Sequence, residues 1–379
     1  MAAARRHPRL HRMALAALPA EALERLARLE CDGHPVLSVY FDLDPSRFPT
    51  PAERDTELSA LLSRAGAHDA DAKRARQAVQ EHPELVHGAS GIAIFSCAAT
   101  GALEILPLPG PVEPLAIVDA VPWLEPLAAM VATGDWGVAV ISRRAARLFR
   151  GGPDGLVQFA AVEDELHPRH SQGGMSQARF QRGIEQQVAE HVRHATELLL
   201  RAHQRRPFEQ LAIVASDELW PVVEADLHRD LRDRVAGVIR QDLEHATVEG
   251  IARAVSPVVD AAERERERTL ISRLEDALGT GGPAAAGLDE VLASLREQRV
   301  ELLLLADQTS LTAGLCARCG RLSPSSDDRC ADDGEPLIPV DAGEHILALA
   351  AQHSIGVAVL RHESEALLVH GQIAALLRW

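Results

Sequence analysis

Short apolar runs alternate with amphipathic segments along most of the chain. The runs VLSVYF, QLAIVAS and VELLLLAD are apolar at nearly every position, which predicts buried strands, and GIAIFSC is a shorter strand-like run. The segment from about 176 to 204 predicts one long helix instead. Its apolar residues recur at steps of three and four: Phe180, Ile184, Val188, Val192, Ala195, Leu199 and Ala202. Helices that alternate with buried strands indicate an α/β fold.

Local composition divides the 379 residues into three predicted domains. A proline-rich stretch at 106–115 closes an N-terminal α/β domain, residues 1–122. A middle domain follows over 123–262. It ends in a highly charged helix, 245–268, in which AAERERERTL predicts an inter-domain connector with a solvated face. The C-terminal α/β domain, 263–379, begins with the helical segment TLISRLEDALG and contains a cysteine-bearing insertion at 314–337.

The charge balance excludes one way of binding nucleic acid. The chain has 55 acidic and 39 basic residues, a formal net charge of −16, so overall attraction to RNA or DNA is not expected. Lys73 is the only lysine. Codon usage in a GC-rich genome explains that scarcity, and so does a preference for the planar guanidinium at phosphate sites. No apolar run approaches the roughly 20 residues of a membrane span, so we expect no membrane partner.

Five cysteines favour a cytoplasmic protein with one metal site. Their odd number, and the clustering of three within fifteen residues, argue against a secreted disulfide framework. Cys316 and Cys319 form one CxxC pair, and Cys330 and Asp333 form a matching CxxD pair ten residues later. Three thiolates and a carboxylate can bind zinc tetrahedrally, so the spacing predicts a structural zinc ribbon.

Two alternatives to this ligand set stay open. Aspartate is a less usual structural ligand, and Asp332 or His345 could take the fourth position instead. A degenerate ribbon that folds without metal is the other interpretation.

A polar loop at 167–182 reverses the sign of the local charge. No acidic residue lies between Leu166 and Gly183, whereas Arg169, Arg179 and Arg182 supply three positive charges. Two glycines just before a helix allow close backbone approach and leave N–H groups that favour an anion. The alternative is a surface loop in which the glycine pair gives only flexibility.

The motif GGMSQARFQR in this loop resembles the GGQ loop of the archaeal and eukaryotic class-1 release factor superfamily, which reads GGQS-x-x-RF-x-R. The WGVAVISRR hairpin before it, LAIVAS after it and the terminal IAALLRW are similar to the same family in the same order. The resemblance is strongest to the bacterial branch, which is related to the ankyrin-zinc-finger type peptidyl-tRNA hydrolases of ribosome quality control. The loop residues that match are Gly173, Gly174, Ser176, Arg179, Phe180 and Arg182.

The resemblance implies a three-domain α/β architecture. Its middle domain has a mixed sheet bearing the loop, and its α/β/α C-terminal domain has a small zinc-ribbon-like insertion. It further implies a ribosome-associated factor that acts on peptidyl-tRNA at the peptidyl-transferase centre. The loop residues assigned to catalysis are Gly173, Gly174, Met175 and Gln177, and those assigned to RNA binding are Arg169, His170, Ser176, Arg179 and Arg182. The implied partners are ribosomal RNA and peptidyl-tRNA, with a translational GTPase as a further candidate, and we expect a monomer.

Two departures from the family pattern affect the predicted activity. Met175 stands where the family has glutamine, so the backbone N–H is kept but the amide donor and acceptor are lost. The Asn-Ile-Lys-Ser loop of stop-codon readers is also absent, because the sole lysine lies in DAKRARQ. The sequence therefore predicts codon-independent release or rescue. The alternatives are a noncatalytic ribosomal A-site binder in hibernation or stress, and a zinc-ribbon interaction scaffold.

Overall fold

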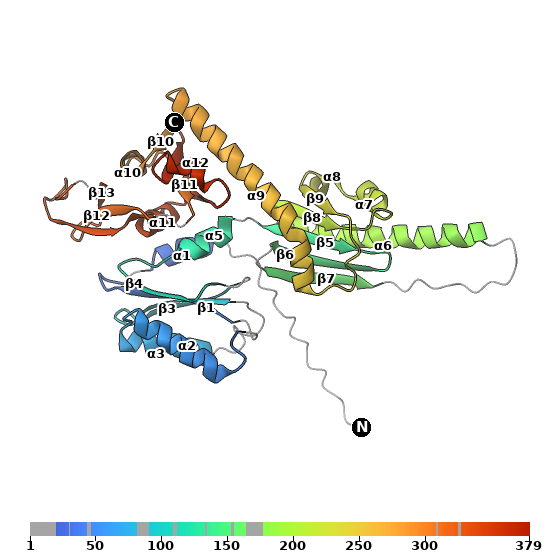
Figure 1. Cartoon of the computed structure of the whole chain (residues 1–379), viewed down its shortest axis with the longest axis horizontal. Helices are drawn as coiled ribbons and strands as arrows, with labels where there is room; N and C mark the ends of the chain where they lie inside the picture. Colours follow the sequence, from blue (N-terminus) through green and yellow to red (C-terminus); the bar gives the residue numbers. More distant parts are fainter. Residues whose placement is uncertain are drawn as a thin grey trace.

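In the computed structural model, the described residues form four β-sheets and the helices that cover them (Figure 1). Among the residues it describes, no helix combines the length and the apolar character needed to cross a membrane. The described residues are 20–29, 31–43, 47–81, 91–108, 112–132, 135–152, 155–163, 177–307, 310–324 and 327–379.

The N-terminal sheet is antiparallel with the order β3-β2-β1-β4. Its strands are β1 (Val36–Asp42), β2 (Gly91–Cys97), β3 (Ala102–Leu108) and β4 (Leu115–Asp119). Every residue of β1 and β2 is buried, as their apolar runs predict, because helices cover both faces. One face carries α2 (Pro51–Arg64) and α3 (Asp69–Glu81), and the other carries α1 (Ala20–Ala27) and α5 (Glu125–Ala132).

The middle sheet is mixed, with the order β7-β6-β5-β8-β9. It consists of β5 (Trp136–Ile141), β6 (Ala145–Gly152), β7 (Gly155–Glu163), β8 (Gln210–Val214) and β9 (Val235–Ile239). The first three strands run antiparallel, whereas β8 and β9 run parallel to β5. Helices α6 (Gln177–Arg205), α7 (Trp220–Asp226) and α8 (Arg229–Arg232) cover one face. The predicted apolar stripe of α6 is confirmed, since Val188, Val192, Ala195 and Leu199 are buried against this sheet.

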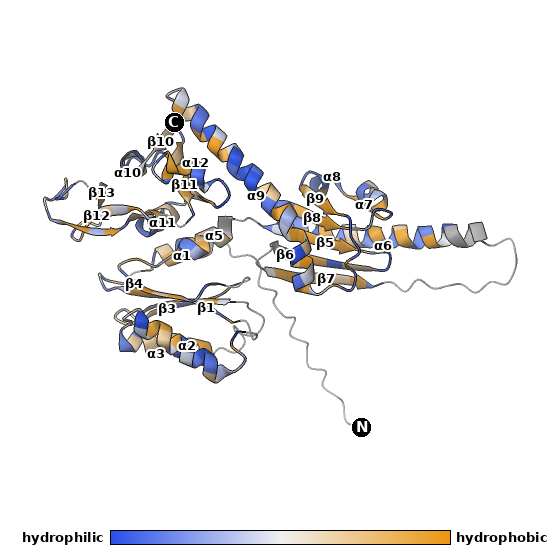
Figure 2. Ribbon diagram, in the orientation of Figure 1, coloured by the Kyte–Doolittle hydropathy of each residue, from blue (hydrophilic) through white to orange (hydrophobic). Residues whose placement is uncertain are grey.

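One continuous helix, α9 (Val248–Gly279), replaces the two helical segments expected on either side of residue 268. Its first half packs Ile251, Val255 and Val259 on the middle sheet, and its second half packs Leu270 and Leu274 on the C-terminal sheet. Figure 2 shows the stretch between these contacts as strongly hydrophilic. Packing at both ends keeps the charged middle helical, so the domain boundary expected after residue 262 lies inside the helix.

The C-terminal sheet has the order β10-β16-β11-β15, with a three-stranded ribbon, β13-β12-β14, beside it. The sheet strands are β10 (Ala284–Ala286), β11 (Val300–Ala306), β15 (Gly356–Leu360) and β16 (Ile373–Leu377). Helices α10 (Leu288–Arg296) and α11 (Ala342–Gln352) pack on one face, and α9 with α12 (Ser364–Leu368) on the other. The ribbon strands are β12 (Thr312–Cys316), β13 (Leu322–Pro324) and β14 (Leu337–Asp341).

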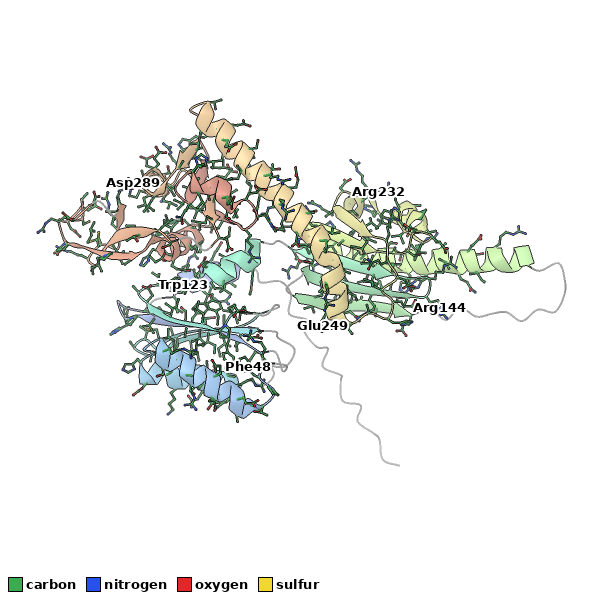
Figure 3. The ribbon with its side chains drawn as sticks, viewed as in Figure 1. Phe48, Trp123, Arg144, Arg232, Glu249 and Asp289 are labelled. Atoms are coloured by element: carbon green, nitrogen blue, oxygen red, sulfur yellow. The ribbon has the colours of Figure 1, made fainter. Side chains whose placement is uncertain are left out.

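The N-terminal and C-terminal sheets share their hydrophobic cores. Ala348 of α11 lies in the N-terminal core, and Ala128 of α5 lies in the C-terminal core. The Arg28 guanidinium donates to the Gln352 carbonyl at 3.2 Å, and the Gln352 amide donates to the Ala27 carbonyl at 2.7 Å. Figure 3 labels Trp123 close to where α1 and α5 meet the C-terminal domain. Helix α5 therefore joins these two sheets, although the sequence places it in the expected middle domain.

Candidate functional site

The loop predicted from the glycine pair lies almost wholly outside the described residues, between the end of β7 and the start of α6. Gln177 and Arg179 belong to the first turn of α6, and their side chains are also outside the described set, whereas Arg182 is exposed on the same helix. The predicted residues of which the structure describes nothing are Arg169, His170, Gly173, Gly174, Met175 and Ser176.

Helix α6, which follows the loop in sequence, extends beyond the middle sheet. It has 29 residues, which corresponds to a rod of about 43 Å. Among the residues of α6 whose side chains the structure describes, Ile184 is the first to contact the middle sheet and is half-buried, whereas Val188 and Val192 are buried against it. Figure 1 shows the first turns of α6 projecting beyond the strands. The loop is therefore attached to the free end of a helix whose other end is embedded in the core.

The embedded end of α6 is fixed by a buried polar cluster. Asp135 pairs with the Arg150 guanidinium and with Arg206 Nε at 2.7 Å, and Arg150 also donates to the Arg206 carbonyl at 2.7 Å. The Arg150 guanidinium lies 4.2 Å from the centre of the Phe208 ring. His203 Nδ1 accepts the Phe208 N–H at 3.0 Å, and burial lowers the pKa of this imidazole. These contacts make α6 a rigid support.

The cysteine cluster is built from two turns of the same design. In the first, the Gly320 N–H donates to the Cys316 carbonyl at 2.9 Å, and the Cys316 N–H donates to the Arg321 carbonyl at 2.9 Å. The second turn repeats both bonds: the Gly334 N–H donates to the Cys330 carbonyl at 2.9 Å, and the Cys330 N–H donates to the Glu335 carbonyl at 2.8 Å.

Each turn closes on a glycine with positive φ, 71° at Gly320 and 72° at Gly334. Because this conformation is costly for residues with a Cβ atom, the glycine after each ligand pair belongs to the motif.

The side chains of Cys316, Cys319, Cys330 and Asp333 converge as the spacing predicts. Their ligand atoms all lie within 4.8 Å of one another. Cys316 Sγ is 3.4 Å from both Asp333 oxygens, and Cys319 Sγ is 3.5 Å from Cys330 Sγ. A tetrahedral zinc ion places two sulfurs about 3.8 Å apart and a sulfur and an oxygen about 3.5 Å apart. The four side chains therefore form a candidate metal site of the right size.

The electrostatics of the cluster also suit a cation. The Glu335 N–H donates to Asp333 Oδ1 at 3.1 Å and lowers the pKa of that carboxyl. For Cys319, the Arg321 N–H lowers the pKa, but burial and the neighbouring Cys316, Cys330 and Asp333 together raise it to about 12. A divalent cation reverses that mutual repulsion and favours the thiolates.

The two alternative fourth ligands are engaged elsewhere. Asp332 pairs with the Arg321 guanidinium, and His345 Nδ1 lies 3.0 Å from the Asp341 carbonyl oxygen. Asp333 is thus the carboxylate that completes the cluster.

Sequence reasoning missed two buried carboxylates that join distant segments. Glu267 of α9 is 5% exposed and accepts three backbone N–H bonds, from Arg361 at 3.0 Å and from His362 and Glu363 at 2.8 Å. Glu344 of α11 accepts two more from the start of α5. Nothing in the local pattern distinguishes them from solvated glutamates, because their partners lie about 95 and 220 residues away in sequence.

Comparison with known proteins gives one family and several structures. Residues 122–267 match the model of bacterial archaeo-eukaryotic release factor family 10. No curated protein matches the sequence. An archaeal translation termination factor, aRF1, is 18% identical with a TM-score of 0.27, covering 96% of this chain and 99% of its own.

Two further structures are similar along the chain. Pelota from Archaeoglobus fulgidus is 13% identical over 96% of this chain and 94% of its own, with a TM-score of 0.35. A ribosome-bound archaeal Pelota, described together with ABCE1, is 13% identical over 97% and 96%, with a TM-score of 0.41. Residues 122–267 of this chain therefore resemble the bacterial archaeo-eukaryotic release factor family.

Proposed function

We propose that this protein enters the ribosome and presents the loop at 167–182 to peptidyl-tRNA in the peptidyl-transferase centre, for codon-independent release or rescue. The observation that carries the proposal is the projecting N-terminal end of α6, which the loop directly precedes in sequence, within the segment that matches the family model. A rod of about 43 Å anchored by Asp135 and Arg150 can carry a narrow loop into a deep cavity. Arg182, exposed on this rod, would face RNA phosphate.

The proposed chemistry uses backbone and water. Gly173 and Gly174 would let the backbone approach the ester, and a backbone N–H of the loop would stabilise the oxyanion or the leaving group. Met175 supplies the N–H of the family's glutamine position but not its amide. Gln177 offers an amide two residues later, at the start of α6. Binding would be the task of Arg169, His170, Ser176, Arg179 and Arg182.

A second function is favoured by Met175 itself. A factor that only occupies the ribosomal A site, in hibernation or stress, needs the charge and shape of the loop but not the glutamine amide. Both functions imply a cytoplasmic monomer with ribosomal RNA and peptidyl-tRNA as partners, and both leave a place for a translational GTPase.

We also propose that Cys316, Cys319, Cys330 and Asp333 hold a structural zinc ion, which would tie the two turns of the ribbon together.

Ribosome co-sedimentation tests the binding step. The triple variant Arg169→Glu, Arg179→Glu, Arg182→Glu should lose co-sedimentation, whereas a control triple variant should keep it. The control changes three exposed arginines outside the loop to glutamate: Arg64, Arg201 and Arg229. Equal binding by both triple variants would contradict the proposal.

Peptide release separates the two functions. The wild type and Met175→Gln are incubated with ribosomes that carry labelled peptidyl-tRNA, and free peptide is measured. Release by the wild type, abolished in Gly174→Pro, supports a hydrolase. Release by Met175→Gln alone supports the noncatalytic binder.

A further inference from the structure

A cavity of about 300 Å³ lies between the ribbon and the helices α10 and α11. Its walls come from three elements: Leu295 of α10, Leu322 of β13 and Leu349 of α11. Leu322 is 5% exposed and packs in the C-terminal core together with residues of both helices. The cavity is therefore formed by packed secondary structure, and its volume is at the lower end of the range for ligand pockets.

The rim of the cavity is basic in a protein that is acidic as a whole. Arg296, Arg321 and His353 line it, and Asp332 is the lining carboxylate. Asp332 is already paired with a terminal nitrogen of Arg321. Arg296 Nε donates to the Leu292 carbonyl of its own helix at 3.1 Å, and no carboxylate among the described residues pairs with its terminal nitrogens.

Arg321 has a hydrogen-bond donor without an acceptor among the described residues. Its Nε atom is buried and has no hydrogen-bond partner among the described residues. A buried donor without an acceptor is destabilising, so a local rearrangement that brings an acceptor to Nε when a ligand binds would be favourable. The apolar floor and the Arg296 guanidinium at the rim therefore suit a ligand that combines an apolar group with a carboxylate.

We infer that this cavity is the docking site of an acidic linear segment of a partner protein, which inserts one large apolar side chain between α10 and β13. A buried apolar anchor with charged neighbours is a common way to recognise a peptide. Carboxylates beside the anchor would pair with Arg296 and Arg321. Because the chain carries a net charge of −16, an acidic segment is repelled from most of the surface and attracted here.

Selection from a library of random dodecapeptides displayed on phage tests this inference with the full-length protein. Enriched peptides should place one Phe, Trp, Leu or Met among Asp and Glu. Their affinity, measured by fluorescence anisotropy, should fall at least tenfold in Leu295→Trp, which fills the cavity, and in Arg296→Glu, which reverses the rim charge. Arg273→Glu, an exposed charge reversal on α9, should stay within twofold of the wild type. Circular dichroism melting confirms that each variant folds.

Three results would overturn the inference. In the selection, these are enrichment no stronger than on the double variant that combines Leu295→Trp with Arg296→Glu, and enrichment of basic peptides. In the affinity measurement, it is an affinity that neither single variant changes. Binding of a 20-nucleotide single-stranded RNA that Arg296→Glu abolishes would assign the cavity to nucleic acid instead. Because the cavity is in the C-terminal domain, Arg296→Glu should leave ribosome co-sedimentation unchanged, which separates this test from that of the proposed function.

Discussion

The contact between the N-terminal and C-terminal domains should become less sensitive to pH when Glu344 is replaced by a residue that cannot ionise. This glutamate of α11 is 2% exposed. Its carboxylate oxygens accept the N–H groups of Leu124 at 2.6 Å and Glu125 at 3.0 Å, at the start of α5. Burial is the main cause that raises the pKa of Glu344 from 4.5 to about 8. The two N–H bonds lower this pKa, whereas the neighbouring Glu125 and Asp341 raise it.

The sign and size of the pH dependence follow from these values. A carboxyl with a higher pKa in the folded state binds its proton more tightly there than in the unfolded chain. The contribution of this carboxyl to the free energy of unfolding is therefore fully present below about pH 4.5 and is lost as the pH rises to about 8. The loss cannot exceed about 1.4 kcal/mol per pH unit, which gives a ceiling of about 5 kcal/mol over this window. The groups that face Glu344 across the contact are Tyr40 of β1 and Glu125 of α5.

Hydrogen exchange at the amides of α5 measures this contribution from pH 5 to 9, after correction for the intrinsic exchange rate. In the wild type, the free energy of opening should fall with pH by more than in Glu344→Gln, which cannot ionise. Glu344→Ala should lower it at every pH by about 1–3 kcal/mol, because two buried N–H groups lose their acceptor. Glu275→Gln, an exposed change on α9, is the matched control. Parallel pH profiles of the wild type and Glu344→Gln would refute the reasoning.

Three further predictions concern other parts of the chain. Asp333→Ala should reduce bound zinc, measured by plasma mass spectrometry, well below one ion per chain, whereas Asp332→Ala should keep it; equal loss in both would contradict the ligand assignment. Glu267→Ala should lower the free energy of opening around α12 by about 2–4 kcal/mol, because three N–H groups lose a charged acceptor. Hydrogen exchange there should become faster, and unchanged exchange would contradict the prediction. Gly137→Ala should destabilise the middle domain by about 1–3 kcal/mol in urea unfolding, because a Cβ atom would lie 2.9 Å from the Phe208 ring, and an unchanged midpoint would show that the ring moves aside.

Features encoded by neighbouring residues could be predicted from the sequence. The stripe on α6 follows from a repeat of three and four residues, and the candidate metal site follows from two short turns separated by ten residues. Both depend on spacing within one segment. The sequence could not distinguish Asp333 from Asp332; in the structure Asp333 lies with the three cysteines, whereas Asp332 pairs with Arg321.

Features that depend on distant segments could not be predicted. The cavity beside the ribbon exists because β13 packs near α10 and α11, and no single segment encodes that arrangement. Helix α9 was missed as one element for a related reason. The charge pattern of 260–268 predicts solvent exposure correctly for most of the stretch, but it does not show that apolar contacts on both sides keep the helix continuous.

The continuous helix α9 connects the middle sheet to the C-terminal sheet. Since the N-terminal and C-terminal sheets share cores, they move together, and α9 packs on the middle sheet at one end and on the C-terminal sheet at the other. Trp136 Nε1 donates to Glu263 Oε1 at 3.4 Å, and Glu267 binds three N–H groups of the C-terminal domain one turn later. The orientation of α6 relative to the rest of the protein therefore depends on the turn of α9 between these glutamates. Pro257, which lacks the N–H of an ordinary helical residue, lies two turns before it and weakens the helix on the side of the middle sheet. The charged run at 260–268 is thus the part of α9 that joins its contacts with the middle sheet to its contacts with the C-terminal sheet.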